Sequence, residues 1–357
     1  MTLIGKEKEY LYDVAVIRIA LIVLLVLYHA FAIFVGAWET PEGYPHIESY
    51  YWIGTVSYSF MLPAFVFISG LIFGHSWKKA DGKIEPKTLI LKKLKRLFLP
   101  SIIFSAIYVF AFYDIHTSPF AIIYKILSGA GHLWFLPMLF WCFTLTFMIE
   151  KSGIKWQIMV PCLLVLTFCS VIVLPLRLNL TLYYLIYFYI GFKITSSDIK
   201  LSFKLKYLLA FFTVYLATLI LKNPILLGVE SSLPESYSGV NFLSAELINK
   251  GICLFTEHLM MLIYSLCGLA ALYIFINYLM DKKKLSISPF FQKLGTLCFG
   301  VYIYQQFILV TLYYRLGLID VMSPVLLPIF GVVVALTLSI ILSYLTLKTR
   351  FGRMLIG

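Results

Sequence analysis

Residues 14–37 read VAVIRIALIVLLVLYHAFAIFVGA, an apolar run in which Arg18 and His29 are the only basic side chains. The run is long enough to cross the hydrocarbon core of a bilayer, which takes about 20 helical residues. Comparable runs recur along the chain, and 61% of its 357 residues are apolar while only 13% are charged. A soluble domain of this length needs a far smaller apolar fraction. We therefore expect an all-α, polytopic helix bundle in a membrane.

Apolar runs separated by charge, Pro or Gly predict about ten transmembrane helices. No small-residue cleavage site follows the first run, so we expect it to remain as a helix rather than to be removed as a signal peptide. We expect one transmembrane domain over residues 1–357, with no appended soluble domain. The ten predicted spans are 14–37, 51–75, 97–113, 133–149, 156–175, 180–192, 207–221, 252–280, 294–314 and 324–347.

The basic residues are distributed unevenly between the predicted loops. The N-terminus, the C-terminal tail and the loops after the even-numbered spans contain 23 of the 29 Lys and Arg residues. Cytoplasmic loops accumulate positive charge, so this asymmetry predicts that both termini are cytoplasmic. It also accounts for the net charge of +12 without a nucleic-acid partner. The two longest stretches on the opposite side, 38–50 and 223–250, are candidates to cover a site there.

Arg18 and His29 are the candidate functional residues of the first span. Their eleven-residue spacing corresponds to about 1100°, which is within about 20° of three full turns and puts both on one helix face. Along the axis they lie about 16 Å apart, with His29 the deeper residue. Titratable groups inside a span are costly and are functional candidates by default. For Arg18 the alternatives are extension toward the headgroups or pairing with Asp13, and for His29 a hydrogen bond between helices.

Other features favour structural readings when each is taken alone. Ser69 and Gly70 are typical of close helix packing, and aromatic residues around His132 and Trp134 are expected at a membrane interface. The adjacent pair Glu257 and His258 suits a structural role or a polar cavity equally. The six cysteines lie in apolar runs without metal-ligand spacing. We therefore expect no metal site.

Taken in order, several of these elements resemble the acyltransferase-3 family of membrane proteins. The resemblance rests on the following stretches: Asp13 and Arg18 to His29; Phe67-Ile68-Ser69-Gly70; Lys93, Arg96 and Pro100; His132-Leu133-Trp134-Phe135-Leu136; and Leu294-Gly295 through Tyr302-Ile303-Tyr304. Each motif is weak alone, whereas the ordered set spans most of the chain. The chain departs from the family pattern at Cys298-Phe299 and at Gln305, where members often carry Ser-Tyr and a His.

The resemblance implies a membrane O-acyltransferase that moves an acyl group, most often acetyl, from cytoplasmic acyl-CoA to a hydroxyl of a glycan or lipid-linked sugar. His29 would be the general base, assisted by Arg18. Acyl-CoA would bind through Arg18, Lys93, Arg96 and Ser69, and His132 and Trp134 would lie on the acceptor side. Acyl-CoA, typically acetyl-CoA, would be a co-substrate rather than a bound cofactor. The expected location is the inner membrane of a bacterium.

A transporter or flippase for a glycolipid or polyprenyl-linked sugar is the competing interpretation. In that case Arg18 and His29 would line a pathway and no covalent chemistry would occur. A purely structural membrane subunit is a third reading, in which replacement of His29 lowers stability without a specific loss of turnover. Acyl-CoA consumption separates the enzyme from the other two. The acceptor, the acyl chain length and the oligomeric state do not follow from the sequence.

Overall fold

The computed structural model describes residues 3–113, 118–199, 201, 204–235, 244–283 and 289–357, and these residues contain no β-strand. The predicted all-α class is therefore confirmed. The helices, with short 3-10 or π turns labelled η, are α1 (Leu3–Ala30), η1 (Ala32–Val35), α2 (Glu48–Ser59), α3 (Met61–Lys79), α4 (Pro86–Lys93), η2 (Leu94–Phe98), α5 (Leu99–Phe112), α6 (Pro119–Leu127), η3 (Gly131–Trp134), α7 (Phe135–Lys151), α8 (Trp156–Phe168), η4 (Cys169–Val171), η5 (Pro175–Arg177), α9 (Leu178–Ser196), α10 (Leu205–Ser232), α11 (Ala245–Lys283), α12 (Pro289–Val310), η6 (Thr311–Arg315), α13 (Leu318–Val321), α14 (Leu326–Lys348) and α15 (Arg350–Ile356).

Each of the ten predicted spans falls on one or more of these helices. By length and composition, 7 helical segments among the described residues are able to cross a membrane, and the apolar helices Val14–Ala30 and Trp156–Val171 are shorter. This supports a multi-pass integral membrane protein. The number ten and the cytoplasmic termini stay predictions. The 7 segments are Glu48–Lys79, Pro86–Phe112, Gly131–Lys151, Leu205–Ser232, Ala245–Met280, Phe290–Arg315 and Leu326–Lys348.

The chain forms two compact units, Met1–Lys200 with Leu285–Gly357, and Leu201–Lys284. The second unit is an antiparallel pair of helices, α10 and α11. Lys222 Nζ donates to Glu257 Oε1 at 2.8 Å across this pair, and His258 Nδ1 donates to the Leu254 carbonyl of its own helix at 2.8 Å. Glu257 therefore has a partner within the pair. The prediction of one domain over residues 1–357 stays a prediction.

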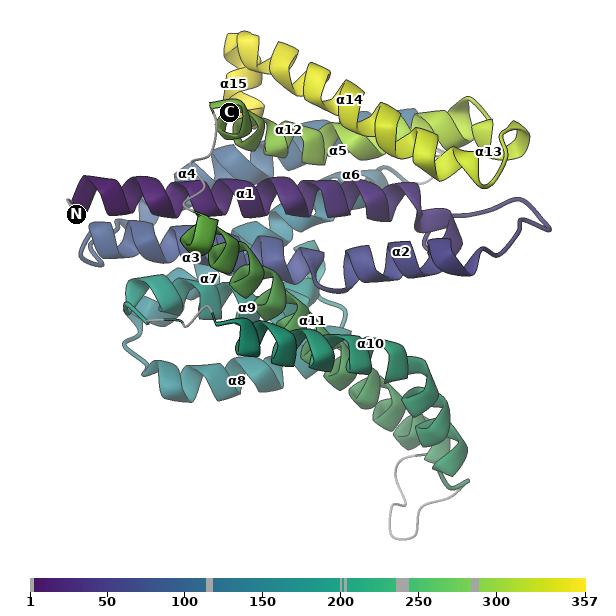
Figure 1. The fold of residues 1–357 in the computed structure, drawn as a ribbon, viewed down its shortest axis with the longest axis horizontal. Coiled ribbons are helices and arrows are strands. Elements are labelled where there is room, and N and C mark those ends of the chain that lie inside the picture. Colours follow the sequence, from purple (N-terminus) through teal and green to yellow (C-terminus); the bar gives the residue numbers. More distant parts are fainter. Residues whose placement is uncertain (1–2, 114–117, 200, 202–203, 236–243, 284–288) are drawn as a thin grey trace. The chain divides into compact units, whose positions relative to one another are not determined.

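Within the first unit, α1 packs along α12 and both helices run in the same direction (Figure 1). A Cβ added at Gly295 would lie 3.3 Å from the Ala15 side chain. Further along both helices, the Tyr313 hydroxyl donates to the Ala30 carbonyl at 2.9 Å. This packing places the C-terminal half of α1 beside the middle of α12.

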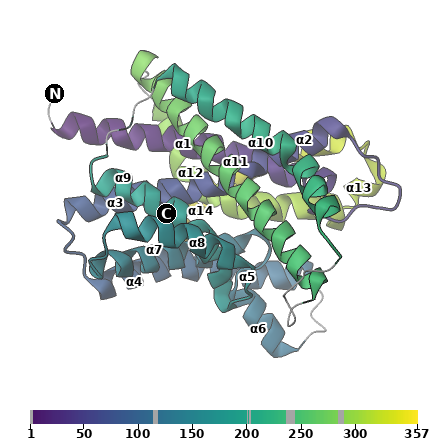
Figure 2. The same cartoon turned by 90° about the horizontal axis from the view of Figure 1, so that it is seen from below.

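Helices α3 and α9 pack against one another without intervening side chains, and they lie side by side in Figure 2. Small residues allow helix backbones to approach closely in membranes. A Cβ at Gly70 would lie 2.0 Å from the Phe188 carbonyl oxygen, and one at Gly191 would lie 2.2 Å from that of Phe67. Gly70 therefore serves close packing, as its sequence context indicated.

Prolines near the starts of three helices explain where the spans are interrupted. Proline cannot donate to the carbonyl four residues earlier and its ring clashes with that carbonyl. Pro63 follows the break at Phe60 between α2 and α3, Pro100 follows the π turn η2, and Pro137 follows the 3-10 turn η3. Two of these breaks, at Phe60 and at η3, contribute residues to the cavity described next.

Candidate functional site

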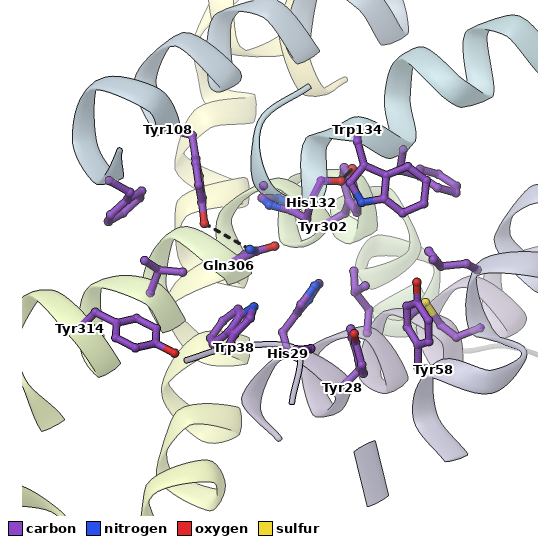
Figure 3. A pocket seen from close by; sticks show the side chains of 18 of the residues that line it. Tyr28, His29, Trp38, Tyr58, Tyr108, His132, Trp134, Tyr302, Gln306 and Tyr314 are labelled. Atoms are coloured by element: carbon purple, nitrogen blue, oxygen red, sulfur yellow. Dashed lines mark hydrogen bonds between the residues drawn. The ribbon is translucent and has the colours of Figure 1, made fainter. Parts of the chain in front are cut away.

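A cavity of about 530 Å³ lies in the first unit, at the C-terminal end of α1. Its walls come from α1, the segment after η1, the break between α2 and α3, α5, η3 and α12. Figure 3 shows the side chains of His29, His132, Trp38 and Gln306 gathered around it. Segments far apart in the sequence therefore converge on one cavity that both predicted histidines line.

His29 is held by a residue of α12 that lies behind it. Its Nδ1 lies 3.1 Å from Oε1 of Gln305, and both side chains are buried, with exposed fractions of 8% and 0%. A carbonyl oxygen only accepts hydrogen bonds, so Nδ1 carries the hydrogen. The other ring nitrogen, Nε2, then keeps its lone pair. This is the tautomer that a general base requires.

His132 lies in η3, where two glycines shape the backbone. Gly129 and Gly131 have φ of 81° and 54°, a left-handed region that glycine adopts readily. A Cβ at Gly131 would also lie 2.8 Å from the Tyr108 ring. His132 Nε2 donates to the Ile303 carbonyl at 3.0 Å, and the Tyr302 hydroxyl donates to the His132 carbonyl at 2.7 Å. These bonds attach η3 to α12.

The imidazole of His132 retains one unused nitrogen. Because Nε2 is the donor, Nδ1 carries a lone pair, and it is buried without a hydrogen-bond partner among the described residues. The rings of His29 and His132 lie 6.1 Å apart at an angle of 71°. Two unprotonated ring nitrogens are therefore available near a common space, and a buried unpaired polar atom calls for an explanation.

Trp38 covers His29 from the segment that follows η1. Gly36 ends η1 with φ of 69°, and this turn redirects the chain toward α1. The indole ring then stacks on the imidazole of His29, with 6.0 Å between ring centroids and 21° between planes. Trp38 also contacts the rings of Tyr313 and Tyr314 at 5.9 Å and 6.1 Å. The segment 38–50 thus contributes directly to the cavity, as its length and composition indicated.

Aromatic side chains and one amide form most of the remaining wall. Gln306 Nε2 donates to the Tyr108 hydroxyl at 3.2 Å, while Gln306 Oε1 is buried and lacks a partner in the part of the chain described. Trp134 lies beside Tyr184 with 6.2 Å between ring centroids. The other aromatic lining residues are Tyr28, Tyr58, Phe112, Tyr113, Phe135, Tyr302 and Tyr314.

The structure brings together three of the predicted site residues, namely His29, His132 and Trp134. Arg18, Ser69, Lys93 and Arg96 do not line the cavity. Arg18 lies along α1, near enough to Cys298 of α12 for an electrostatic interaction, and the side chain of Asp13, its suggested partner, lies outside the described residues. Ser69 Oγ donates to the Phe65 carbonyl of its own helix at 2.9 Å.

Lys93 and Arg96 are the two cations of the basic segment 78–96 that were predicted to bind acyl-CoA. They lie around the π turn η2. Lys93 Nζ sits 3.3 Å from the centroid of the Phe143 ring, a cation–π contact, while Arg96 is exposed. A mid-helix π turn often marks a functional position. Of these two cations, Lys93 is partly buried and Arg96 is exposed to solvent, and both are outside the cavity.

Several cavity residues have no counterpart among the predicted site residues. Gln306 of the cavity wall, like Gln305 behind His29, carried a usable signal, since amides inside an apolar span need partners. Glu39 carried none, because the sequence gives no way to place a loop residue against a helix end. Tyr108 and Tyr314 are indistinguishable by pattern from the many other aromatic residues of the chain.

The arrangement supplies a base, neutral hydrogen-bond donors and a largely apolar lining. A base and neutral donors are what deprotonation of a hydroxyl and stabilisation of charge on a reacting carbonyl require. Among the residues that the structure describes, no three His, Cys, Asp or Glu side chains form a group able to hold a metal ion.

These features define an integral membrane protein with a buried two-histidine cavity inside a helix bundle. The family model of the acyltransferase domain of the acyltransferase-3 family matches residues 11–346, nearly the whole chain. The chain belongs to this family and is a membrane acyltransferase, as the ordered motifs indicated. No curated protein and no solved structure matches it.

Proposed function

We propose that the protein transfers an acyl group, most commonly acetyl, from cytoplasmic acyl-CoA to a hydroxyl of a glycan or lipid-linked sugar at the outer face of a bacterial inner membrane. The observation that carries the proposal is His29, whose Nδ1–H is directed to Gln305 while the ring faces a cavity shared with His132. An oriented imidazole with a free Nε2 lone pair has the geometry of a general base.

The reaction proceeds by direct transfer in this proposal. His29 Nε2 removes the proton of the acceptor hydroxyl, and the oxygen attacks the thioester carbonyl carbon. A carbon–oxygen bond forms, the carbon–sulfur bond breaks, and the leaving thiolate takes the proton from the imidazolium to give free CoA. Neutral donors in the cavity, such as the indole N–H groups of Trp38 and Trp134, stabilise the oxyanion.

The location of the positive charges supports a donor that only partly enters the cavity. No Lys or Arg lines it among the described residues, so the phosphates of a nucleotide carrier have no counter-charge there. Arg18, Lys93 and Arg96 lie outside, where guanidinium and ammonium groups suit phosphate. In this proposal the nucleotide end binds at these cations, and the pantetheine arm reaches toward His29.

The aromatic walls support a sugar acceptor. Trp38, Trp134 and the tyrosines offer flat apolar surfaces together with hydroxyl and N–H groups, and sugars present both C–H faces and hydroxyl edges. The cavity is also confined to about 530 Å³. This supports entry of one or two sugar units beside the acyl group rather than a whole polymer.

The test is acyl-CoA turnover by purified protein in lipid nanodiscs, with a broad pool of glycan acceptors. We expect His29→Gln to abolish transfer while the protein remains folded, and His46→Ala, at an exposed histidine, to leave turnover unchanged. Wild-type protein that neither binds nor consumes any acyl-CoA would contradict the proposal and favour the transporter. Loss of folding without specific loss of turnover in His29→Gln would favour a structural role.

A further inference from the structure

Glu39 is the only side chain with a formal charge among the described residues that line the cavity. Its backbone is anchored by the π turn η6, since the Tyr314 hydroxyl donates to the Glu39 backbone carbonyl at 2.8 Å. The preceding residue, Trp38, stacks on His29. A carboxylate is therefore held one residue away from the ring that covers the proposed base, at the exposed rim of the cavity.

The two buried polar atoms of the cavity that lack a hydrogen-bond partner among the described residues are both acceptors. His132 Nδ1 and Gln306 Oε1 are buried without partners in the described part of the chain, and neither can donate, because His132 Nε2 and Gln306 Nε2 carry the hydrogens. His29 Nε2 is likewise an acceptor when Nδ1 donates to Gln305. With the Glu39 carboxylate, the site presents four separate acceptor groups.

An acceptor-rich site selects a donor-rich ligand. Hydroxyl and ammonium groups supply hydrogens to such atoms, whereas an ionised carboxylate, phosphate or sulfate only accepts. An anionic group on the ligand would offer no hydrogen to the buried acceptors and would also meet the like charge of Glu39 at the cavity rim. The tyrosine hydroxyls and indole N–H groups are neutral donors that hydroxyl oxygens satisfy.

We propose that the unit entering this cavity is a neutral or amino-substituted polyol, and that Glu39 is a specificity-determining residue that excludes anionic units. This deepens the proposed function, on which it rests for the identification of the ligand as the acyl acceptor. Any phosphate of a lipid-linked acceptor then lies outside the cavity, away from the reacting sugar.

The experiment uses purified full-length protein in nanodiscs and three sugars that differ in charge: glucose, glucosamine and glucuronate. Binding is measured by saturation-transfer NMR without acyl-CoA, and acylation is measured by mass spectrometry after adding acetyl-CoA to an oligosaccharide mixture containing the same three units. Glu39→Gln removes the cavity charge, and Glu42→Gln makes the same change at an exposed residue of the same segment that does not line the cavity.

We expect wild type and Glu42→Gln to bind glucose and glucosamine and to discriminate against glucuronate by roughly tenfold or more. Glu39→Gln should lose most of that discrimination while still binding glucose. Equal binding of glucuronate and glucose by wild type, unchanged discrimination in Glu39→Gln, or no binding of any sugar would overturn the proposal. Charge discrimination in binding with no acylated product and no acyl-CoA consumed would instead contradict the proposed function and leave the sugar site standing.

Discussion

Nδ1 of His29 and Oε1 of Gln305 lie 3.1 Å apart, and this contact joins α1 to α12 beneath the cavity. Gln305 is fully buried and does not itself line the cavity. In the proposed reaction it would therefore act on the reacting atoms only through His29, whose Nδ1–H it accepts. We predict that this residue, which departs from the family pattern, has a positioning role through its amide carbonyl.

Replacing Gln305 should lower turnover without preventing folding. Gln305→Met keeps the length and volume of the side chain and removes the acceptor, so we expect kcat to fall by about 10- to 100-fold, with a KM for acyl-CoA close to that of wild type. Gln305→Glu retains an acceptor oxygen and should keep substantially more activity. Steady-state kinetics in nanodiscs measure kcat and KM separately for each variant. Equal kcat in Gln305→Met and Gln305→Glu would contradict the positioning role.

The roles of the two ring nitrogens of His132 can be tested separately by mutation. A Gln amide nitrogen reaches about as far as Nε2, so His132→Gln keeps the bond to the Ile303 carbonyl and removes the Nδ1 acceptor. We expect the KM for the acyl acceptor to rise by roughly tenfold at unchanged thermal stability. His132→Asn is too short to reach Ile303 and should lower the melting temperature. Initial rates with each substrate varied separately, together with melting curves, check both expectations.

The contact between α3 and α9 should not tolerate a single added methyl group. Alanine at Gly70 or Gly191 would place its Cβ against the carbonyl oxygen of Phe188 or Phe67, so the helices must separate. We expect each substitution to lower the free energy of unfolding by about 1–3 kcal/mol. Gly228→Ala is the matched control, because nothing lies within 4 Å of its added Cβ. Thermal unfolding in detergent compares the Gly70 and Gly191 variants with Gly228→Ala, and an equal loss of stability in all three would contradict the close helix contact.

The basic segment offers a test of where the nucleotide end of the donor binds. We expect Arg96→Gln to raise the KM for acetyl-CoA by about tenfold, because an exposed guanidinium loses its phosphate partner. With S-acetyl pantetheine, which lacks the nucleotide phosphates, wild type and Arg96→Gln should give the same KM. Lys83→Gln, at an exposed cation in the connection between α3 and α4, should leave both values unchanged. An equal rise with both donors would mean that Arg96 affects the protein rather than the carrier.

The sequence predicted the fold class and marked His29 as a candidate, since each depends on a local signal. Long apolar runs define helices without any knowledge of their neighbours, and a titratable side chain inside such a run stands out wherever it packs. His132 lies just before the predicted span 133–149 and became a candidate only through the family resemblance. The common cavity of the two histidines could not be predicted, because it depends on α1 and η3 both meeting α12.

The remaining site residues depend on geometry that no periodic pattern encodes. Glu39 and Trp38 reach the cavity through the turn at Gly36. Lys93 looked like a phosphate ligand from its charge, yet its ammonium lies on the Phe143 ring, so only the packing reveals its present partner. The roles assigned to Arg18, Ser69, Lys93 and Arg96 stay predictions.

A buried ion pair joins α7 to α9 and should behave as a coupled unit. Lys193 Nζ lies 2.7 Å from Glu150 Oε2, the two side chains are 15% and 12% exposed, and the Tyr189 hydroxyl donates to Glu150 Oε1 at 3.0 Å. Lys193→Met leaves a buried carboxylate without its cation, and such losses cost up to about 3–5 kcal/mol. The double variant Glu150→Gln with Lys193→Met removes both charges, so we expect it to be more stable than Lys193→Met alone. Unfolding of the wild type, both single variants and the double variant forms a double-mutant cycle. A double variant whose loss equals the sum of the two single losses would show that the pair contributes no coupling.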